Sequence, residues 1–137
     1  MMKKLLTVLV LMAIVAGAVV PILVQADTVS ACEGRTPGYW KNHIEEWEGW
    51  GPGACFNHVF GVGPHQTLIN VLNTGGGKWY ALDRHAVAAI LNATSSDLDF
   101  YDYSWVIQNV QDAYGTGNWE YYKDILEDAN EMGVAGD

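Results

Sequence analysis

Cysteine is scarce in this sequence, which excludes a fold held together by a framework of disulfides. The 137 residues contain two cysteines, Cys32 and Cys55, whereas small exported domains without a sufficient core rely on several bonds. In an oxidising compartment we expect Cys32 and Cys55 to form one disulfide. A free thiol at Cys55 is the alternative, and thiol titration of the unfolded, unreduced protein distinguishes the two.

Positive charge is also scarce. Seven Lys and Arg residues stand against sixteen Asp and Glu residues, which gives a formal net charge of −9 at pH 7. A chain of this charge repels nucleic acids and anionic membrane surfaces, so we expect no nucleic-acid partner. The acidic surface keeps an exported protein soluble, and cation binding is the alternative interpretation.

The amino-terminal segment has the order of features that is typical of a secretory signal peptide. Lys3 and Lys4 precede an apolar run over residues 5–20, and Pro21 and a small-residue ending at Ala26 follow. This order predicts cleavage after Ala26, which removes residues 1–26 and leaves a secreted or cell-surface protein.

Two alternatives would keep the protein on a membrane. Residues 5–24 are long enough to span a bilayer if the signal is retained as an anchor. The small residues before Cys32 also have the form of a bacterial lipoprotein site, which would acylate this cysteine. If the signal is cleaved and Cys32 is not acylated, we expect no membrane span or anchor in the mature chain. The intact mass of protein from the native host separates these outcomes.

Strand signals are absent, so residues 27–137 are predicted to form a single small all-α domain. We expect a compact bundle of about five helices around a central apolar helix over residues 78–92. From Ala86 to Leu91 every residue is apolar, so other elements must surround this helix. Asp83 and Arg84 lie at its near end, where we expect both to reach solvent.

Four further helices are expected around the central one. They cover residues 36–48, 64–72, 104–114 and 118–132. The first begins with Thr36 as its N-cap and Pro37 at its first helical position, and the last has the clearest amphipathic pattern. The glycine-rich segment over residues 49–63 shows no sustained period and is predicted to be a structured loop.

The four histidines are the candidate metal ligands. His43 falls on the apolar stripe of the first helix and His85 on the central helix, so we expect both rings to face the interior. Imidazole is the commonest nitrogen ligand, and three such groups with water form a catalytic zinc site. His43 and His85 with His58 or His65, and with Glu46, could therefore hold a divalent metal. The alternative is two core histidines hydrogen-bonded to the backbone or to each other.

Two kinds of surface group are candidates for modification or binding. Asn92 begins an Asn-Ala-Thr tripeptide, the acceptor pattern for N-glycosylation in an exported protein. Tryptophans at helical spacing belong in the core, which leaves Trp50, Trp79 and Trp119, near loops and helix ends, as candidates for exposure. Exposed aromatic rings stack on sugars or anchor protein interfaces.

Two motifs resemble a known family. The run Gly38-Tyr39-Trp40-Lys41-Asn42-His43, preceded by Cys32, is similar to the Gly-Tyr-Trp-Lys-Asn-His signature of a family of exported bacterial and archaeal domains. Arg84-His85 and the apolar residues after it extend the resemblance. It implies a secreted or surface-attached protein, often beside adhesion-like modules, and it implies no reaction. The family tends to place its second cysteine at the carboxyl-terminal end, where this chain has Met132-Gly133-Val134.

These observations predict a secreted or cell-surface, non-catalytic helical module with a binding or envelope role. No nucleophile constellation is visible, so enzymatic activity is not expected. The partner would be a protein or a carbohydrate surface. The alternative is a histidine-based metal-binding protein or metalloenzyme, and metal analysis of the purified mature protein separates the two.

Overall fold

The structure is a computed structural model that describes residues 33–133. Cys32, the predicted signal segment and the last four residues lie outside this range. The elements in chain order are α2 (Pro37–Asn42), the 3₁₀ helix η1 (Ile44–Glu46), α3 (Phe56–Phe60), α4 (Leu68–Asn73), α5 (Trp79–Thr94), α6 (Tyr103–Thr116) and α7 (Trp119–Asn130). The described residues contain no strand, and strand-like pairing among them is limited to an isolated bridge between Cys55 and Thr67. The predicted all-α class is confirmed.

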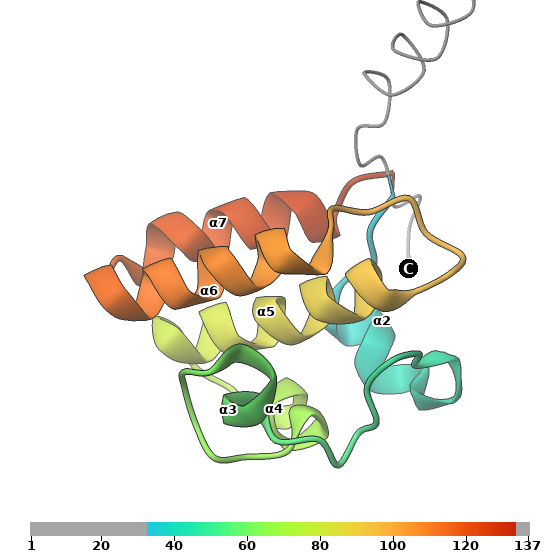
Figure 1. Ribbon diagram of the computed structural model, residues 1–137, viewed down its shortest axis with the longest axis horizontal. Coiled ribbons are helices and arrows are strands. Elements are labelled where there is room, and N and C mark those ends of the chain that lie inside the picture. The colour runs from blue at the N-terminus through green and yellow to red at the C-terminus, as the bar shows by residue number, and fades with distance from the viewer. Residues whose placement is uncertain (1–32, 134–137) are drawn as a thin grey trace, which may run out of the picture. The chain divides into compact units, whose positions relative to one another are not determined.

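Helix α5 is the centre of the domain, as its apolar run predicted. It contacts α2, α4, α6 and α7, and Figure 1 shows it running between the α6–α7 pair on one side and α3 and α4 on the other. Every side chain from Ala86 to Leu91 is at most 1% exposed. A helix that is apolar on every face must bury every face, and here its neighbours provide that cover. Among residues 33–133, no helix is long and apolar enough to cross a membrane.

The first helix is shorter than its apolar stripe predicted. It ends after Asn42 because His43 leaves the helical region, with φ −131° and ψ 52°. The carbonyl of Trp40 accepts hydrogen bonds from the His43 backbone N–H at 3.3 Å and from the indole Nε1 of Trp47 at 2.9 Å. These two donors satisfy a carbonyl that the next helical turn would otherwise use, so the chain turns into η1. Ile44, which was expected on the buried stripe, is 43% exposed.

The segment predicted as a loop over residues 49–63 contains a short helix. In α3 the side chains of Phe56, Val59 and Phe60 are buried, which is the i, i+3, i+4 spacing of one helical face over too few residues to form a recognisable period. Gly61 ends the helix in the left-handed region with φ 74°, a conformation that glycine adopts without steric cost. Helix α4 begins at Leu68 and not at Pro64 as predicted, because Thr67 is its N-cap.

Candidate functional site

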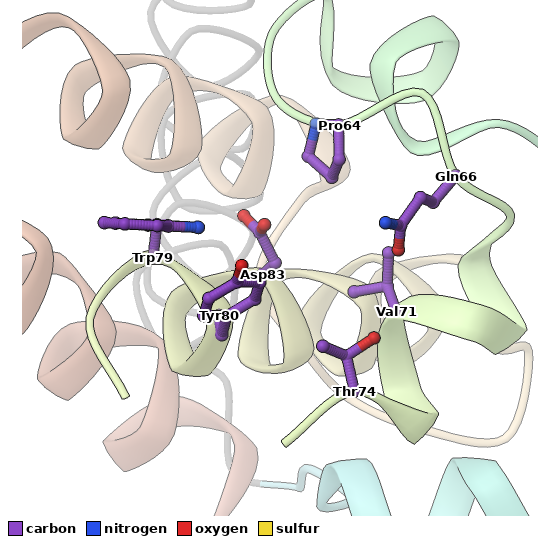
Figure 2. Close-up of a pocket in the computed structure, with 7 residues that line it drawn as sticks. All are labelled: Pro64, Gln66, Val71, Thr74, Trp79, Tyr80 and Asp83. Atoms are coloured by element: carbon purple, nitrogen blue, oxygen red, sulfur yellow. The ribbon is translucent and has the colours of Figure 1, made fainter. Parts of the chain in front are cut away.

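A cavity lies at the start of α5. Its volume is about 160 Å³, and its lining residues are Pro64, Gln66, Val71, Thr74, Trp79, Tyr80 and Asp83. We call this cavity the aromatic pocket. Figure 2 shows the two aromatic side chains on the α5 side and the residues from the 64–74 segment on the other, with the Asp83 carboxylate between Trp79 and Pro64.

The loop before α5 is held in place by backbone geometry and by one arginine. Gly76 has φ 104°, and an added Cβ would lie 3.2 Å from the Tyr80 ring, so this position favours glycine on two grounds. Arg84 donates from Nη1 to the Thr74 carbonyl at 2.6 Å and from Nη2 to the Gly76 carbonyl at 2.7 Å. The guanidinium therefore fastens the loop to α5. Arg84 was expected to reach solvent, but the residue is half-buried.

Asp83 is buried, which corrects the prediction that it reaches solvent. Its side chain faces α6 and the pocket, the residue is 3% exposed, and the Tyr114 hydroxyl donates to Oδ1 at 2.7 Å. Burial raises the pKa of Asp83 from 3.8 to about 7, against the smaller lowering effects of the Tyr114 hydrogen bond and the Arg84 charge. Burial and the hydrogen bond to Asp83 also raise the pKa of Tyr114. A carboxyl with a strongly shifted pKa beside a cavity is typical of a functional site.

Two exposed aromatic rings form the wall of the aromatic pocket. Trp79 is 41% exposed and Tyr80 is 43% exposed, and their ring centroids are 5.1 Å apart. The Trp119 ring packs edge to face against Trp79, with centroids 6.2 Å apart, and against Tyr114, with centroids 4.8 Å apart. The aromatic contacts therefore extend from the pocket to Tyr114, which is hydrogen-bonded to Asp83. Of the three candidate tryptophans, Trp79 is exposed as predicted, whereas Trp119 and Trp50 are partly buried against the core.

Sequence reasoning identified Trp79 as a binding candidate and missed Asp83 and Tyr80. The signal was present, because Asp83 follows Trp79 by four positions and Tyr80 by three on one helix, so its side chain shares a face with both rings. The sequence did not reveal that residues 64–74 cover this face.

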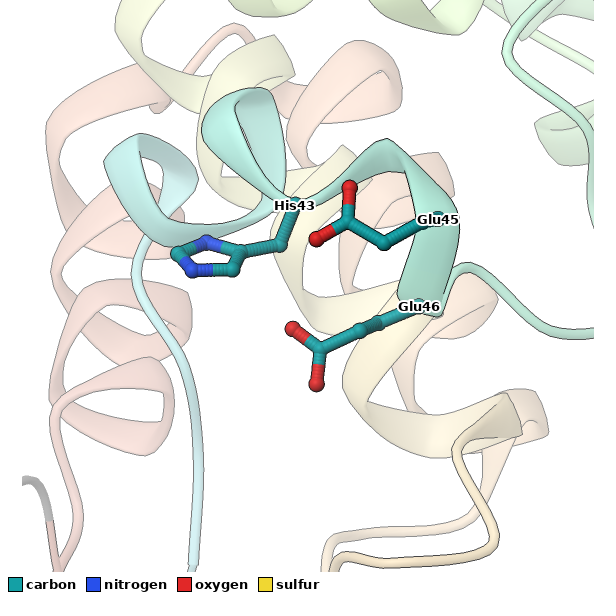
Figure 3. A group of neighbouring side chains, drawn as sticks. All are labelled: His43, Glu45 and Glu46. Carbon is teal, nitrogen blue, oxygen red and sulfur yellow. The ribbon is translucent and has the colours of Figure 1, made fainter.

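A second cluster lies at the junction of α2 and η1. His43, Glu45 and Glu46 each offer one ligand atom, and these atoms lie within 4.8 Å of one another; Figure 3 shows the three side chains gathered on one side of the turn. His43 is half-buried and is absent from the buried core; its ring stacks on Tyr39 with centroids 4.0 Å apart, and Nδ1 lies 2.7 Å from the Tyr39 carbonyl oxygen. The prediction that His43 faces the interior is therefore wrong, because the helix ends at this residue.

His85 behaves as predicted and faces the interior. The Asn130 side chain lies 3.3 Å from its Nδ1 and donates to its carbonyl at 3.0 Å, and Nε2 is 3.9 Å from the Glu127 carboxylate. Burial lowers the pKa of His85 from 6.5 to about 4, against the raising effect of Glu127. The ring is therefore neutral at pH 7 and is satisfied by Asn130.

The alternative metal site, in which His43 and His85 join His58 or His65, does not form in the described residues. Within residues 33–133, no group of three or more potential ligand side chains includes His58, His65 or His85. His58 and His65 are exposed on separate segments, and His85 is directed toward α7. Glu46, which the metal hypothesis included as a ligand, does lie beside His43.

Asn92 is the centre of a buried polar network. Its Oδ1 accepts from Trp40 Nε1 at 2.8 Å and from the Arg35 backbone N–H at 2.9 Å. Its Nδ2 donates to the Arg35 carbonyl and to Asn130 Oδ1, each at 2.9 Å. Asn92 is 0% exposed and its Nδ2 donates to two partners, so this candidate glycosylation site has no room for a sugar in the folded domain.

The predicted disulfide stays a prediction. Cys55 is half-buried with a free thiol, and Cys32 lies outside the described residues. The backbone N–H of Gly34, near Cys32, donates to the Met132 carbonyl at 2.9 Å. Gly34 therefore lies beside the segment that follows α7, which is where the resembling family tends to place its second cysteine.

Comparisons with known proteins add no relative. No family model matches the chain, and neither a curated protein nor a solved structure matches it. The resemblance to the Gly-Tyr-Trp-Lys-Asn-His family therefore stays a prediction that rests on the two motifs.

Proposed function

We propose that this chain is an exported, non-catalytic module that binds a partner through the aromatic pocket. The observation that supports this most strongly is the combination of two exposed aromatic rings with a buried carboxyl in one cavity of about 160 Å³. Binding sites are typically concave and mostly apolar, with a few polar groups that fix the orientation of the ligand. Export rests on the signal-like order of the amino-terminal residues.

The chemistry of the pocket lining favours binding over catalysis. No histidine, cysteine or serine lines the pocket, so a nucleophile next to a general base is missing from it. Two of its residues carry a hydroxyl, Thr74 and Tyr80, and that of Thr74 is already engaged, because it donates to the Asn70 carbonyl at 2.8 Å. Asp83 is hydrogen-bonded by Tyr114, a phenol whose raised pKa keeps it protonated and makes it a poor proton donor.

Replacing Trp79 with alanine is expected to remove the ligand-binding wall without unfolding the domain, because the ring is 41% exposed. Three probes would be titrated while tryptophan fluorescence or protein NMR shifts are followed: n-butylammonium chloride, methyl β-glucoside and sodium butyrate. We expect at least one probe to bind the parent protein and to lose about tenfold in affinity in Trp79→Ala, which corresponds to about 1.4 kcal/mol.

Tyr103→Ala is the matched control for this experiment. Tyr103 is 53% exposed and begins α6, which Figure 1 shows running antiparallel to α5, so the residue lies at the opposite end of the helix pair from Trp79. Its replacement should leave probe binding unchanged. If all three probes fail to bind, or if both variants respond equally, the aromatic pocket is not the binding site.

A second candidate function is metal binding at His43, Glu45 and Glu46. A carbonyl oxygen can only accept, so the 2.7 Å contact with the Tyr39 carbonyl places the hydrogen on Nδ1. In the neutral ring, Nε2 then carries the lone pair that a metal requires, and such a backbone contact is the usual way to orient a ligating histidine. The Tyr39 hydroxyl similarly orients Glu46 by donating to Oε2 at 2.6 Å.

Zinc titration by calorimetry tests this second candidate. We expect His43→Ala to weaken zinc binding at least tenfold, because it removes the one nitrogen ligand of the group. His58→Ala is the control, since His58 is exposed and belongs to no such group. Equal losses in the two variants would show that zinc binds adventitiously to surface histidines.

A further inference from the structure

We propose that the aromatic pocket binds a primary alkylammonium group, of the kind carried by a lysine side chain of a protein partner. In this arrangement the ammonium contacts the Asp83 carboxylate and the faces of Trp79 and Tyr80. The inference rests on the proposed function, because it names the ligand class of that same pocket.

The first argument is that no cationic side chain of the described residues lies within ion-pairing distance of Asp83. It takes part in none of the ion pairs of residues 33–133. Arg84, which follows it in the sequence, directs its guanidinium to the carbonyls of Thr74 and Gly76. A buried carboxylate is costly unless a charge or several donors compensate it, and Tyr114 provides one donor. A ligand cation would provide the missing charge.

The second argument is the aromatic wall. The face of an aromatic ring carries partial negative charge, and an ammonium within about 6 Å of the centroid of such a ring is attracted to it. Trp79 and Tyr80 are adjacent, their planes are 38° apart, and both are exposed. Two such faces beside a carboxylate select a cation over a neutral or anionic group.

The third argument is the size and composition of the remaining lining. A cavity needs on the order of 10–15 Å³ to hold one water, so about 160 Å³ admits a group of several heavy atoms, such as a lysine side chain. Pro64 and Val71 give apolar surface for its methylenes. The acidic excess of the chain, with a net charge of −9, also draws cations toward the surface.

A pyranose ring is the competing ligand. A sugar stacks on tryptophan as readily as an alkylammonium does, and Gln66 could hydrogen-bond its hydroxyls. However, a neutral sugar leaves the charge of Asp83 uncompensated, so the buried carboxyl favours the ammonium.

Binding of an ammonium should release a proton from Asp83. The carboxyl changes from COOH to COO⁻, its proton passes to solvent, and the ammonium keeps its own three protons. The groups that face Asp83 are Tyr114 from α6 and Arg84 from α5. The 64–74 side of the pocket contributes Pro64, Gln66, Val71 and Thr74, none of which carries charge. With the pKa of Asp83 at about 7, affinity should rise about tenfold between pH 6 and pH 8.

The test is calorimetric titration of the purified full-length protein with n-butylammonium chloride at pH 6 and pH 8. Two buffers of different ionisation enthalpy measure the proton release. We expect Asp83→Asn to lose about tenfold in affinity at pH 8, with no remaining pH dependence. Asparagine matches the shape of the protonated carboxyl and can still accept from Tyr114, so this variant should fold.

Two neutral probes separate the failure of this inference from the failure of the proposed function. If n-butanol or methyl β-glucoside binds as tightly as n-butylammonium, and Trp79→Ala abolishes that binding, the pocket is a binding site but its ligand is not an ammonium. If no probe shows binding that depends on Trp79, the pocket is not the site and both proposals are overturned. If n-butylammonium binds equally to the parent protein and to Asp83→Asn, the carboxylate is not the counter-charge and the inference is overturned.

Discussion

Replacing Asn92 with alanine is expected to destabilise the domain by about 3–5 kcal/mol. In the parent protein, Asn92 is the hydrogen-bond partner of the Trp40 indole N–H, of the backbone N–H and carbonyl of Arg35, and of Asn130 Oδ1. The replacement removes the partner of all four groups. Each buried polar group left without a partner costs about 1–3 kcal/mol, and the two Arg35 groups are only part-buried, so the total stays at the lower end of the sum. Domains of this size are stable by about 5–15 kcal/mol in total, so the melting temperature should fall by roughly 15–30 °C.

Asn73→Ala is the control for the Asn92 prediction. Asn73 is exposed at the end of α4, and its side chain donates to the Ile69 carbonyl within the same helix. Surface substitutions of this kind usually change stability by less than about 0.5 kcal/mol. Thermal and urea unfolding of the two variants measure the difference. Similar melting temperatures for Asn92→Ala and Asn73→Ala would contradict the network as a source of stability.

The contrast between these two asparagines shows what local sequence can predict. The apolar run of α5 predicted its central position, and the Thr36 cap was predicted from its type and confirmed by Oγ1 accepting from the Tyr39 N–H at 3.2 Å. Both features depend on neighbours within one or two turns. Asn92 instead meets partners 38 to 57 residues away, so the tripeptide around it suggested an exposed glycosylation site when the residue is fully buried.

The candidate site was only half predictable for the same reason. Exposure of Trp79 follows from its place at a helix end next to a glycine loop. The burial of Asp83 depends on the packing of α6, which brings the Tyr114 hydroxyl to the carboxylate from 31 residues away. The prediction for His43 was wrong in the opposite direction, because the helix ends at this residue and leaves the imidazole half-buried against Tyr39 instead of in the core.

The second large effect concerns pH, because α5 carries a buried carboxyl, Asp83, and a half-buried imidazole, His85, whose pKa values are shifted in opposite directions. The pKa of Asp83 is raised from 3.8 to about 7, so the folded state prefers the protonated acid. The stability from this group is complete below pH 3.8 and is lost as pH rises to 7, by up to about 4 kcal/mol. The pKa of His85 is lowered from 6.5 to about 4. Its stability is present above pH 6.5 and is lost as pH falls to 4, by up to about 3 kcal/mol.

Between pH 4 and pH 6.5 these two dependences should cancel in the parent protein. In this window the folded state holds neutral Asp83 and neutral His85, whereas the unfolded chain holds a carboxylate and an imidazolium. Unfolding therefore moves a proton off one group and onto the other, with no net uptake from the pair. Each group alone would change the free energy of unfolding by about 1.4 kcal/mol per pH unit.

Single replacements should reveal the pH dependence that each group alone gives to the free energy of unfolding. Relative to the parent, Asp83→Asn should gain about 3 kcal/mol in stability as pH rises from 4 to 6.5, because the loss due to Asp83 is removed and the gain due to His85 remains. His85→Gln should change by about the same amount in the opposite direction, whatever constant cost its altered packing adds. Urea unfolding at several pH values measures both, and subtracting the parent value at each pH removes the contribution of the other acidic groups. The double variant should again parallel the parent. Single variants that parallel the parent across this range would show that Asp83 and His85 titrate in the folded protein as they do in the unfolded chain.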